Sequence, residues 1–268
     1  MQTVTHDGVE LAYDVAGPAD GEPVVLLSGL GYGRWMWRWQ RDRLAEEYRP
    51  IRIDNRGAGD SDEPAGPYTI EGMAADVEAV LAAEGVDRAH VVGASMGGMI
   101  AQRYALEYSR AKTLTLCCTT HGGVDAVPIP DETQEQMFDT PKGASERELI
   151  RHRMRPAFNE RFTNRNPHLM DRIIEWRLEQ DAGAPAREAQ AAAALEFDVS
   201  DRLERIRVPT LVMHGTNDRV LPAANGKLLD EKIPETRLEL VEGGSHCFFI
   251  EDSELVNRTL RSFLEDHE

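Results

Sequence analysis

Short apolar runs alternate with longer segments of helical periodicity along this chain, and this alternation most constrains its fold. Strands that alternate with helices build a largely parallel sheet that is covered by helices. Eight runs have the length and apolar content of strands, and we predict strands at residues 4–6, 10–15, 24–28, 51–54, 90–92, 113–118, 210–214 and 237–241. The predicted fold class is therefore α/β, with an eight-stranded, mostly parallel sheet flanked by helices.

The periodic segments predict helices at residues 35–47, 70–84, 96–108, 223–232 and 253–265. Between residues 120 and 200 the strand signals disappear. There, Asn166-Pro167 begins an amphipathic helix that carries Trp176, and residues 186–195 form another. We therefore expect a core made of residues 1–120 and 201–268, with a helical cap insertion at residues 121–200.

A glycine-rich turn follows the fifth predicted strand and begins the next helix. Residues 93–98 read Gly-Ala-Ser-Met-Gly-Gly. In a strand–turn–helix context this spacing predicts an exposed nucleophile at Ser95, because small residues at 93 and 97 let the strained turn pass close to the helix. The alternative is a serine in a purely structural glycine turn.

A serine hydroxyl is a weak nucleophile, so it needs a base that is itself oriented by a carboxylate. Asp218 follows the seventh predicted strand, and His246 follows the eighth. The chain order Ser95, Asp218, His246 is that of the nucleophile, acid and base of serine hydrolases with this strand–turn–helix motif. We predict these three residues as the catalytic triad.

Other residues compete for these roles. Asp125 could supply an acid after the sixth strand, but it lies several residues beyond the strand end. We expect His214 to brace the loop of Asp218 and His121 to line the pocket wall. Cys247 adjoins the predicted base, and we expect it to pack near the site, because the turn holds serine where a cysteine nucleophile would stand.

These motifs resemble the α/β-hydrolase superfamily, in particular its small cap-bearing serine esterases, methylesterases and enol-lactonases. The resemblance spans the chain except the cap, and includes residues 54–61, which are similar to the family's D-x-R-G-x-G-x-S loop. It implies an oxyanion hole made by the backbone N–H groups of Met96 and Leu30. Ser28 stands where a histidine is usual, which leaves open how this loop is held and whether Leu30 or Gly31 supplies the second amide.

An aromatic cluster follows this loop and supplies candidates for the substrate pocket. We expect Trp37 to anchor the core. The predicted substrate-contacting residues are Tyr32, Trp35, Met36, His121, Phe138, Trp176 and Phe248.

The predicted reaction is hydrolysis of carboxylic esters, lactones included, on small to medium, largely apolar substrates through an acyl-enzyme on Ser95. Two alternatives use the same triad: hydrolysis of a carbon–carbon bond and cofactor-free perhydrolysis. A non-catalytic ligand-binding role is the third. The serine in the turn argues against the dehalogenase and epoxide hydrolase relatives, which use aspartate there. We expect no metal and no organic cofactor, since zinc-ligand spacings and phosphate-binding loops are absent from the sequence.

The net charge of the chain limits which molecules it can bind. The 268-residue chain has a net charge of −17, and its basic residues are four lysines and 26 arginines. Nucleic acid and anionic membrane are poor partners for such a field, so we expect a small-molecule ester as partner and a cytoplasmic location, either as a monomer or as a homodimer. The acid excess with few lysines is typical of adaptation to high salt, and equally of an acidic protein from a GC-rich genome.

Overall fold

The computed structural model describes residues 1–267, apart from the side chain of Phe138. Its centre is an eight-stranded sheet in the order β1-β2-β4-β3-β5-β6-β7-β8. The pairs β1–β2 and β2–β4 are antiparallel, and all other neighbours are parallel. The strands are β1 Gln2–His6, β2 Val9–Val15, β3 Pro23–Leu27, β4 Arg49–Ile53, β5 Ala89–Ala94, β6 Ala111–Cys117, β7 Thr210–Gly215 and β8 Thr236–Val241. The predicted fold class is confirmed.

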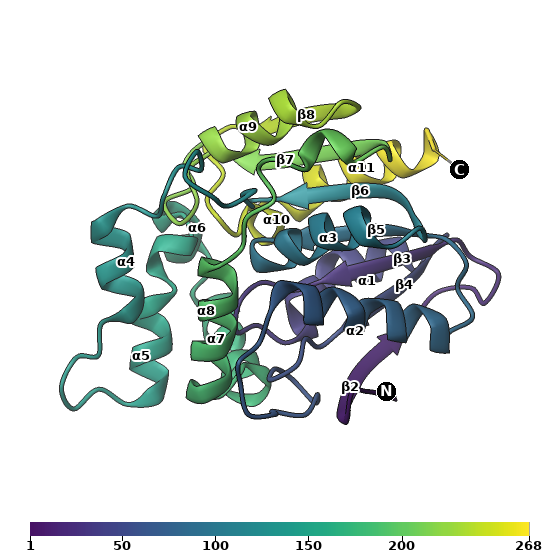
Figure 1. Ribbon diagram of the computed structural model, residues 1–268. Coiled ribbons are helices and arrows are strands. Elements are labelled where there is room, and N and C mark those ends of the chain that lie inside the picture. Colours follow the sequence, from purple (N-terminus) through teal and green to yellow (C-terminus); the bar gives the residue numbers. More distant parts are fainter. Residues whose placement is uncertain (268) are drawn as a thin grey trace.

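Helices cover both faces of the sheet, as Figure 1 shows. One face packs against α2 (Ile70–Ala83), α3 (Met96–Glu107) and α9 (Ala224–Lys232), and the other against α1 (Arg38–Leu44), α10 (Phe248–Glu251) and α11 (Ser253–Glu265). The parallel strand β5 is buried along its whole length because it lies between these two helical layers.

The helix predicted at residues 35–47 is wrong in one respect. The structure divides it into a 3₁₀ turn, η1 (Arg34–Trp37), and α1, which ends at Leu44. The break follows from packing, since Trp35, Met36 and Trp37 are all buried and a regular helix cannot turn three successive side chains into one core.

Segment 121–200 is helical and lies between β6 and β7 in the chain. Its elements are α4 (Asp131–Phe138), α5 (Glu146–Arg153), η2 (Arg155–Ala157), α6 (Glu160–Arg165), α7 (Pro167–Gln180) and α8 (Ala184–Leu195); the short turn η3 (Leu203–Arg205) follows. Proline occupies the first turn of α7, as expected. In Figure 1 the segment stands at the left, where the arrows of β6 and β7 point.

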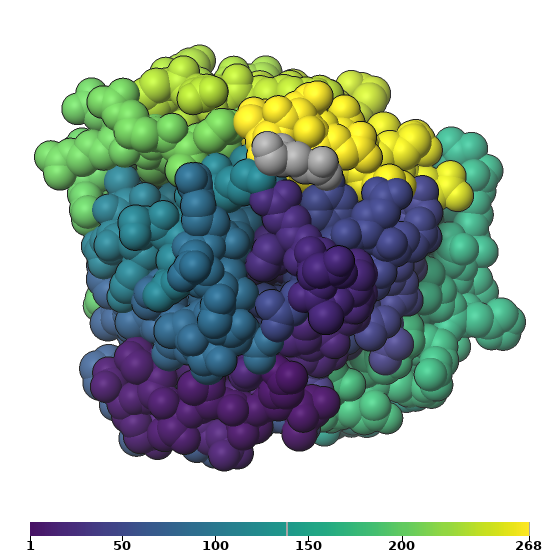
Figure 2. Space-filling view, turned by 90° about the vertical axis from the view of Figure 1, so that its right-hand side faces the viewer, coloured from purple at the N-terminus to yellow at the C-terminus, as the bar shows by residue number. Residues whose placement is uncertain are grey.

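The opposite side of the molecule carries both ends of the chain. Figure 2 shows the amino-terminal segment (purple) and α11 (yellow) on this face, with segment 121–200 (teal and green) at its edge. The structured ends therefore lie away from the carboxyl ends of the parallel strands. Within residues 1–267, no helix has the length and apolarity needed to cross a membrane.

Candidate active site

Ser95 lies at the carboxyl end of β5, in the tight turn that leads into α3. Its φ of 55° is in the left-handed region, which residues other than glycine rarely adopt. The turn is as crowded as the sequence predicts. A Cβ on residue 93 would lie 2.2 Å from the carbonyl oxygen of Gly97, and a Cβ on residue 97 would lie 2.1 Å from that of Leu27. Ser95 itself is half-buried, whereas its neighbours in the turn are buried.

Asp218 and His246 meet after the next strands of the same sheet edge. The Nδ1 of His246 donates to Oδ2 of Asp218 over 2.8 Å. Asp218 follows β7 and His246 follows β8, and only β6 separates β7 from the strand that ends at Ser95. The structure thus gathers the three predicted triad residues at one edge, where the carboxyl ends of parallel strands place ligand sites.

Three hydrogen bonds hold the carboxylate of Asp218, and His214, whose Nε2 bonds the carbonyl oxygen of Leu221 at 2.8 Å, lies beside it. Oδ1 accepts from the backbone N–H groups of Val220 (2.8 Å) and Leu221 (2.9 Å). Oδ2 faces His246 and also Nε2 of His214, at 3.2 Å. Burial alone would raise the pKa of Asp218, but the two histidines hold it well below its ordinary value. Asp218 therefore stays ionised and can orient the imidazole of His246.

The loop after β3, residues 28–31, carries the predicted second amide of the oxyanion hole. A Cβ on residue 29 would lie 3.4 Å from the Cβ of Ser95, so this loop runs directly beside the nucleophile. The N–H of Gly31 donates to Oε1 of Gln190 over 2.7 Å and is therefore occupied. Among the described residues, the N–H groups of Leu30 and Met96 donate to no acceptor outside regular helix and strand bonding. This favours Leu30 over Gly31 as the second donor.

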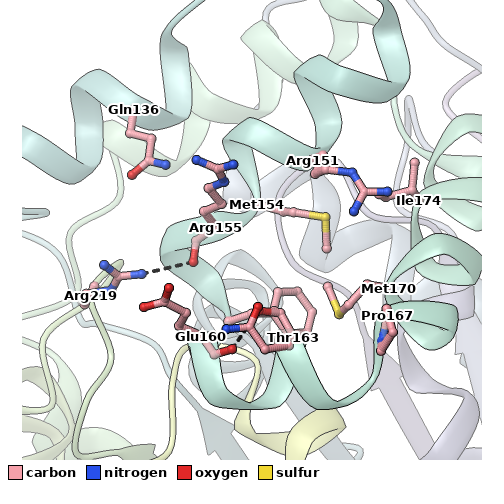
Figure 3. A pocket seen from close by; sticks show the side chains of 12 residues that line it. Gln136, Arg151, Met154, Arg155, Glu160, Thr163, Pro167, Met170, Ile174 and Arg219 are labelled. Carbon is pink, nitrogen blue, oxygen red and sulfur yellow. Dashed lines mark hydrogen bonds between the residues drawn. The ribbon is translucent and has the colours of Figure 1, made fainter.

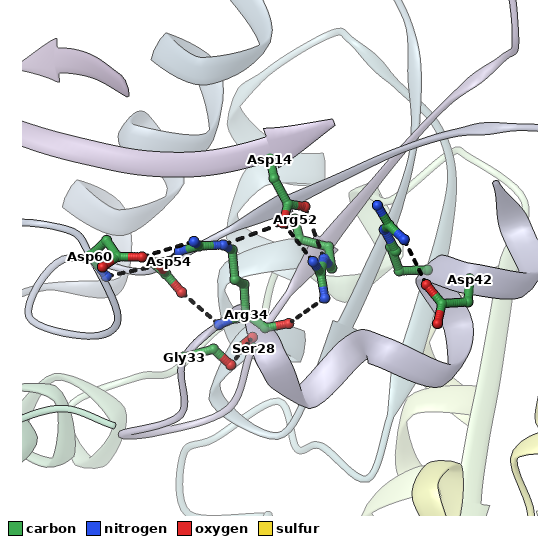
Figure 4. A network of polar contacts seen from close by, with 9 residues as sticks. Asp14, Ser28, Gly33, Arg34, Asp42, Arg52, Asp54 and Asp60 are labelled. Atoms are coloured by element: carbon green, nitrogen blue, oxygen red, sulfur yellow. Dashed lines mark hydrogen bonds and ion pairs between the residues drawn. The ribbon is translucent and has the colours of Figure 1, made fainter. Parts of the chain in front are cut away.

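An ion-pair network holds this loop where the family's usual histidine is missing (Figure 4). The buried Asp54 accepts from the backbone N–H of Arg34 at 2.5 Å and pairs with its guanidinium. Arg34 also pairs with Asp60 at 2.8 Å and with Asp14 at 3.4 Å. Burial raises the pKa of Asp54 in spite of these partners. The network fixes the first residue of η1, just beyond the loop.

Two further contacts hold the same loop. The side-chain amide of Asn55 donates to the carbonyl oxygen of Ser28 over 3.0 Å. Gln190, from α8, donates through Nε2 to the carbonyl of Arg56 over 2.9 Å while it accepts from Gly31. Sequence analysis did not single out Arg34 or Gln190, since one arginine or glutamine carries no local signal of a contact so distant in the chain.

Aromatic side chains join this loop to α7. The ring centroids of Trp35 lie 5.5 Å from those of Tyr32 and 5.8 Å from those of Trp176. Tyr32 and Trp176 are half-buried, and Trp35 is buried. Trp37 is fully buried and packs against Phe249 at 5.3 Å, as expected of a core anchor.

The remaining predicted pocket residues are more enclosed. Met36, His121 and Phe248 are buried, and Nδ1 of His121 bonds the carbonyl oxygen of Gly122 at 2.7 Å. Their contact with a substrate stays a prediction. Phe138 lies outside the described side chains. Cys247 is also buried, and burial raises the pKa of its thiol well above the ordinary value, which keeps it protonated.

A pocket of about 580 Å³ opens within segment 121–200 (Figure 3). Its inner surface includes the buried side chains of Met154, Phe158 and Met170, and its rim includes the exposed Arg155 and Arg219. Arg219 directly follows Asp218 in the chain, but Ser95 and His246 do not line this pocket. Within residues 1–267, no three histidine, cysteine or acidic side chains are grouped so that they could hold a metal.

Comparisons with known proteins agree with this fold. Residues 22–253 match the family model of the alpha/beta hydrolase fold. A protein named as a carbamate hydrolase, RutD, of Azorhizobium caulinodans is 30% identical over 264 residues, which cover 96% of each chain. The enol-lactonase of Burkholderia xenovorans LB400 superposes with a TM-score of 0.85 at 26% identity, covering 98% of this chain and all of that one. The esterase EaEST of Exiguobacterium antarcticum gives 0.85 at 29% identity, covering 97% of each chain. The chain belongs to the α/β-hydrolase family, and hydrolase activity is the function that this membership supports.

Proposed function

We propose that this protein is a serine hydrolase that cleaves carboxylic esters, lactones included, through an acyl-enzyme on Ser95. One observation carries the proposal: the hydrogen-bonded pair His246–Asp218 stands at the same sheet edge as a serine held at a φ of 55°. A serine in this strained turn presents its hydroxyl away from the backbone, and an oriented imidazole is what that hydroxyl needs as a base. The esterase and enol-lactonase among the similar structures support this reaction class.

The proposed reaction assigns a role to each of these groups. Nε2 of His246 takes the hydroxyl proton as Oγ of Ser95 attacks the carbonyl carbon. The N–H groups of Leu30 and Met96 stabilise the negative charge that develops on the carbonyl oxygen. His246 then gives its proton to the departing alcohol oxygen. Water, deprotonated by the same imidazole, attacks the acyl-enzyme, and His246 returns the proton to Oγ of Ser95 as the acid departs. Asp218 stabilises the imidazolium in both halves of the reaction.

Segment 121–200 acts in this proposal as a cap that covers the acyl group. Trp176 of α7 reaches the aromatic side chains beside the oxyanion loop, so it would form the wall opposite the sheet. Replacing it should change the preference for acyl length more than the rate of acylation.

The test is hydrolysis of p-nitrophenyl acetate, butyrate and octanoate by the wild type and by Ser95→Ala. We expect kcat of the variant to fall by roughly 10⁴-fold or more, because removal of a triad member leaves only oxyanion and binding contributions. Ser109→Ala, outside the site, is the control for substitution of a serine. Equal rates for wild type and Ser95→Ala would overturn the proposal.

A further inference from the structure

Arg187, on α8, forms no ion pair with a carboxylate in the part of the chain that the structure describes. Among the described residues no carboxylate lies within 4.0 Å of its guanidinium and no hydrogen bond is made by its side chain, although the chain carries 47 acidic residues. Its side chain is half-buried. Glu63, which approaches the start of α8, is instead hydrogen-bonded to the backbone N–H of Ala186 at 3.2 Å.

The side chain of Arg187 lies over the oxyanion loop. Its Cδ and Cγ are 3.5 and 3.6 Å from the position that a Cβ on Gly31 would occupy. Gly31 directly follows Leu30, the proposed oxyanion donor. Arg187 therefore lies next to the segment that would hold the carbonyl oxygen of a bound ester.

A second arginine, Arg177 of α7, lies against Tyr32, the residue that follows Gly31 in the chain. Nε of Arg177 donates to Oδ2 of Asp181 over 2.6 Å, and its guanidinium carbon lies 4.5 Å from the ring centroid of Tyr32. Asp181 is already shared, since its Oδ1 accepts from Nε1 of Trp35 at 3.1 Å. Among the described residues, the two terminal nitrogens of Arg177 form no hydrogen bond. Asp181 thus binds Arg177 and Trp35, and within residues 1–267 it forms no ion pair with Arg187.

Electrostatics separate the two arginines, because Asp181 helps to raise the pKa of Arg177 in spite of burial, whereas the pKa of Arg187 is lowered. Burial, followed by the like charges of Arg153 and Arg177, lowers the pKa of Arg187, while Asp181 and Glu188 act in the opposite direction. A guanidinium stays charged in proteins, so this environment leaves a positive charge only partly compensated. A group with this surplus is stabilised when an anion binds to it.

We propose that Arg187 and Arg177 form an anion subsite, and that the substrate is an ester or lactone carrying one carboxylate remote from the bond that is cleaved. This inference rests on the proposed function and specifies its substrate class. The carboxylate would bind the two guanidinium groups, and the apolar part of the substrate would lie against Tyr32 and Trp35. An otherwise apolar site with a single cationic end fits such a molecule.

The experiment compares pairs of esters that differ only in charge. On the acyl side, p-nitrophenyl valerate ends in a methyl group where p-nitrophenyl hemiglutarate ends in a carboxylate. p-Tolyl butyrate and p-carboxyphenyl butyrate make the same comparison on the alcohol side. The readout is the ratio of kcat/KM for the anionic ester to that for the neutral ester, measured in wild type, Arg187→Met, Arg187→Lys and the control Arg165→Met, which removes an exposed arginine of the same segment.

We expect a ratio above one for the wild type in one of the two pairs, and a fall of at least about tenfold in Arg187→Met, which corresponds to the loss of one charge-assisted contact. Arg187→Lys should retain part of the ratio, and Arg165→Met all of it. If Ser95-dependent hydrolysis of neutral esters persists while Arg187→Met and Arg165→Met give the same ratio, the anion subsite is refuted and the proposed function stands.

A binding measurement tests the anion subsite without the need for turnover. Monobutyl glutarate, which carries one carboxylate and one ester, should raise the melting temperature of Ser95→Ala, and adding Arg187→Met should abolish this increase. An equal increase in both proteins would overturn the subsite even if no ester were hydrolysed.

Discussion

At the scale of single residues, substitution can show whether Asp218 or the competing Asp125 is the acid of the triad. In Asp218→Asn, the side-chain oxygen can keep both backbone hydrogen bonds, from Val220 and Leu221, while the amide faces His246 and favours the wrong tautomer. We expect kcat for p-nitrophenyl butyrate to fall by roughly 10⁴-fold with little change in the circular dichroism spectrum. Asp125→Asn is the matched control, because Asp125 has only a surface ion pair with Lys232 at 3.6 Å. The larger loss in Asp125→Asn would contradict the assignment.

The buried thiols beside the site give a second prediction. Cys118 and Cys247 are both buried, and burial raises the pKa of each well above its ordinary value. Because the thiolate is the form that reacts, iodoacetamide at about pH 8 should leave the activity of the native enzyme unchanged. The same reagent in urea should label all three cysteines of the chain, which confirms that the reagent is active. Rapid inactivation of the folded enzyme, with labelling at Cys247, would point to a thiol in the reaction.

At the scale of elements, α8 holds the oxyanion loop through Gln190. This buried side chain accepts from the N–H of Gly31 and donates to the carbonyl of Arg56, so it fixes two loops that are far from it in the chain. Gln190→Leu should lower kcat by roughly ten- to a hundredfold, because a small displacement of an oxyanion donor is costly. KM should change little, and esters of every acyl length should lose equally.

Gln190→Glu keeps the acceptor for Gly31 and should retain more activity than Gln190→Leu. Gln134→Leu, on the exposed face of α4, is the control. The melting temperatures of all three variants show whether activity is lost because the oxyanion loop is displaced or because the protein unfolds. This control is needed since unpaired buried groups also cost about 1–3 kcal/mol of stability. A rise in KM with unchanged kcat would refute the positioning role.

The elements themselves could be predicted from the sequence because their signals are local. All eight strands occur within a few residues of their expected ranges, and the crowding at Gly93 and Gly97 follows from the strand–turn–helix pattern. The end of α7, in contrast, docks on the oxyanion loop through the N–H of Ala182, which donates to the carbonyl of Gly31 over 2.8 Å. Such contacts join segments about 150 residues apart in sequence, and no periodicity encodes them. For this reason Gln190 and Arg187 emerge only from the structure.

At the scale of the whole molecule, the net charge of −17 predicts how stability responds to salt. Repulsion among the excess acidic groups acts over the Debye length, which shrinks from about 30 Å at 0.01 M salt to about 3 Å at 1 M. Salt also weakens the surface ion pairs, but exposed pairs contribute at most about 1 kcal/mol each and often nothing. Relief of the long-range repulsion should therefore dominate, and the melting temperature should rise by several degrees between these concentrations of KCl.

A charge-reduced variant tests the cause of that rise. Asp20→Asn, Glu179→Gln and Glu242→Gln together remove three exposed acidic groups, for which no ion pair is found among the described residues. At low salt the triple variant should melt above the wild type, and its gain from KCl should be smaller, because less repulsion remains to be screened. KCl is chosen over sulfate, since sulfate also strengthens apolar burial. If the wild-type melting temperature stays flat or falls with KCl, the acidic surface is not an adaptation to salt, and the arginine preference is left to genome composition.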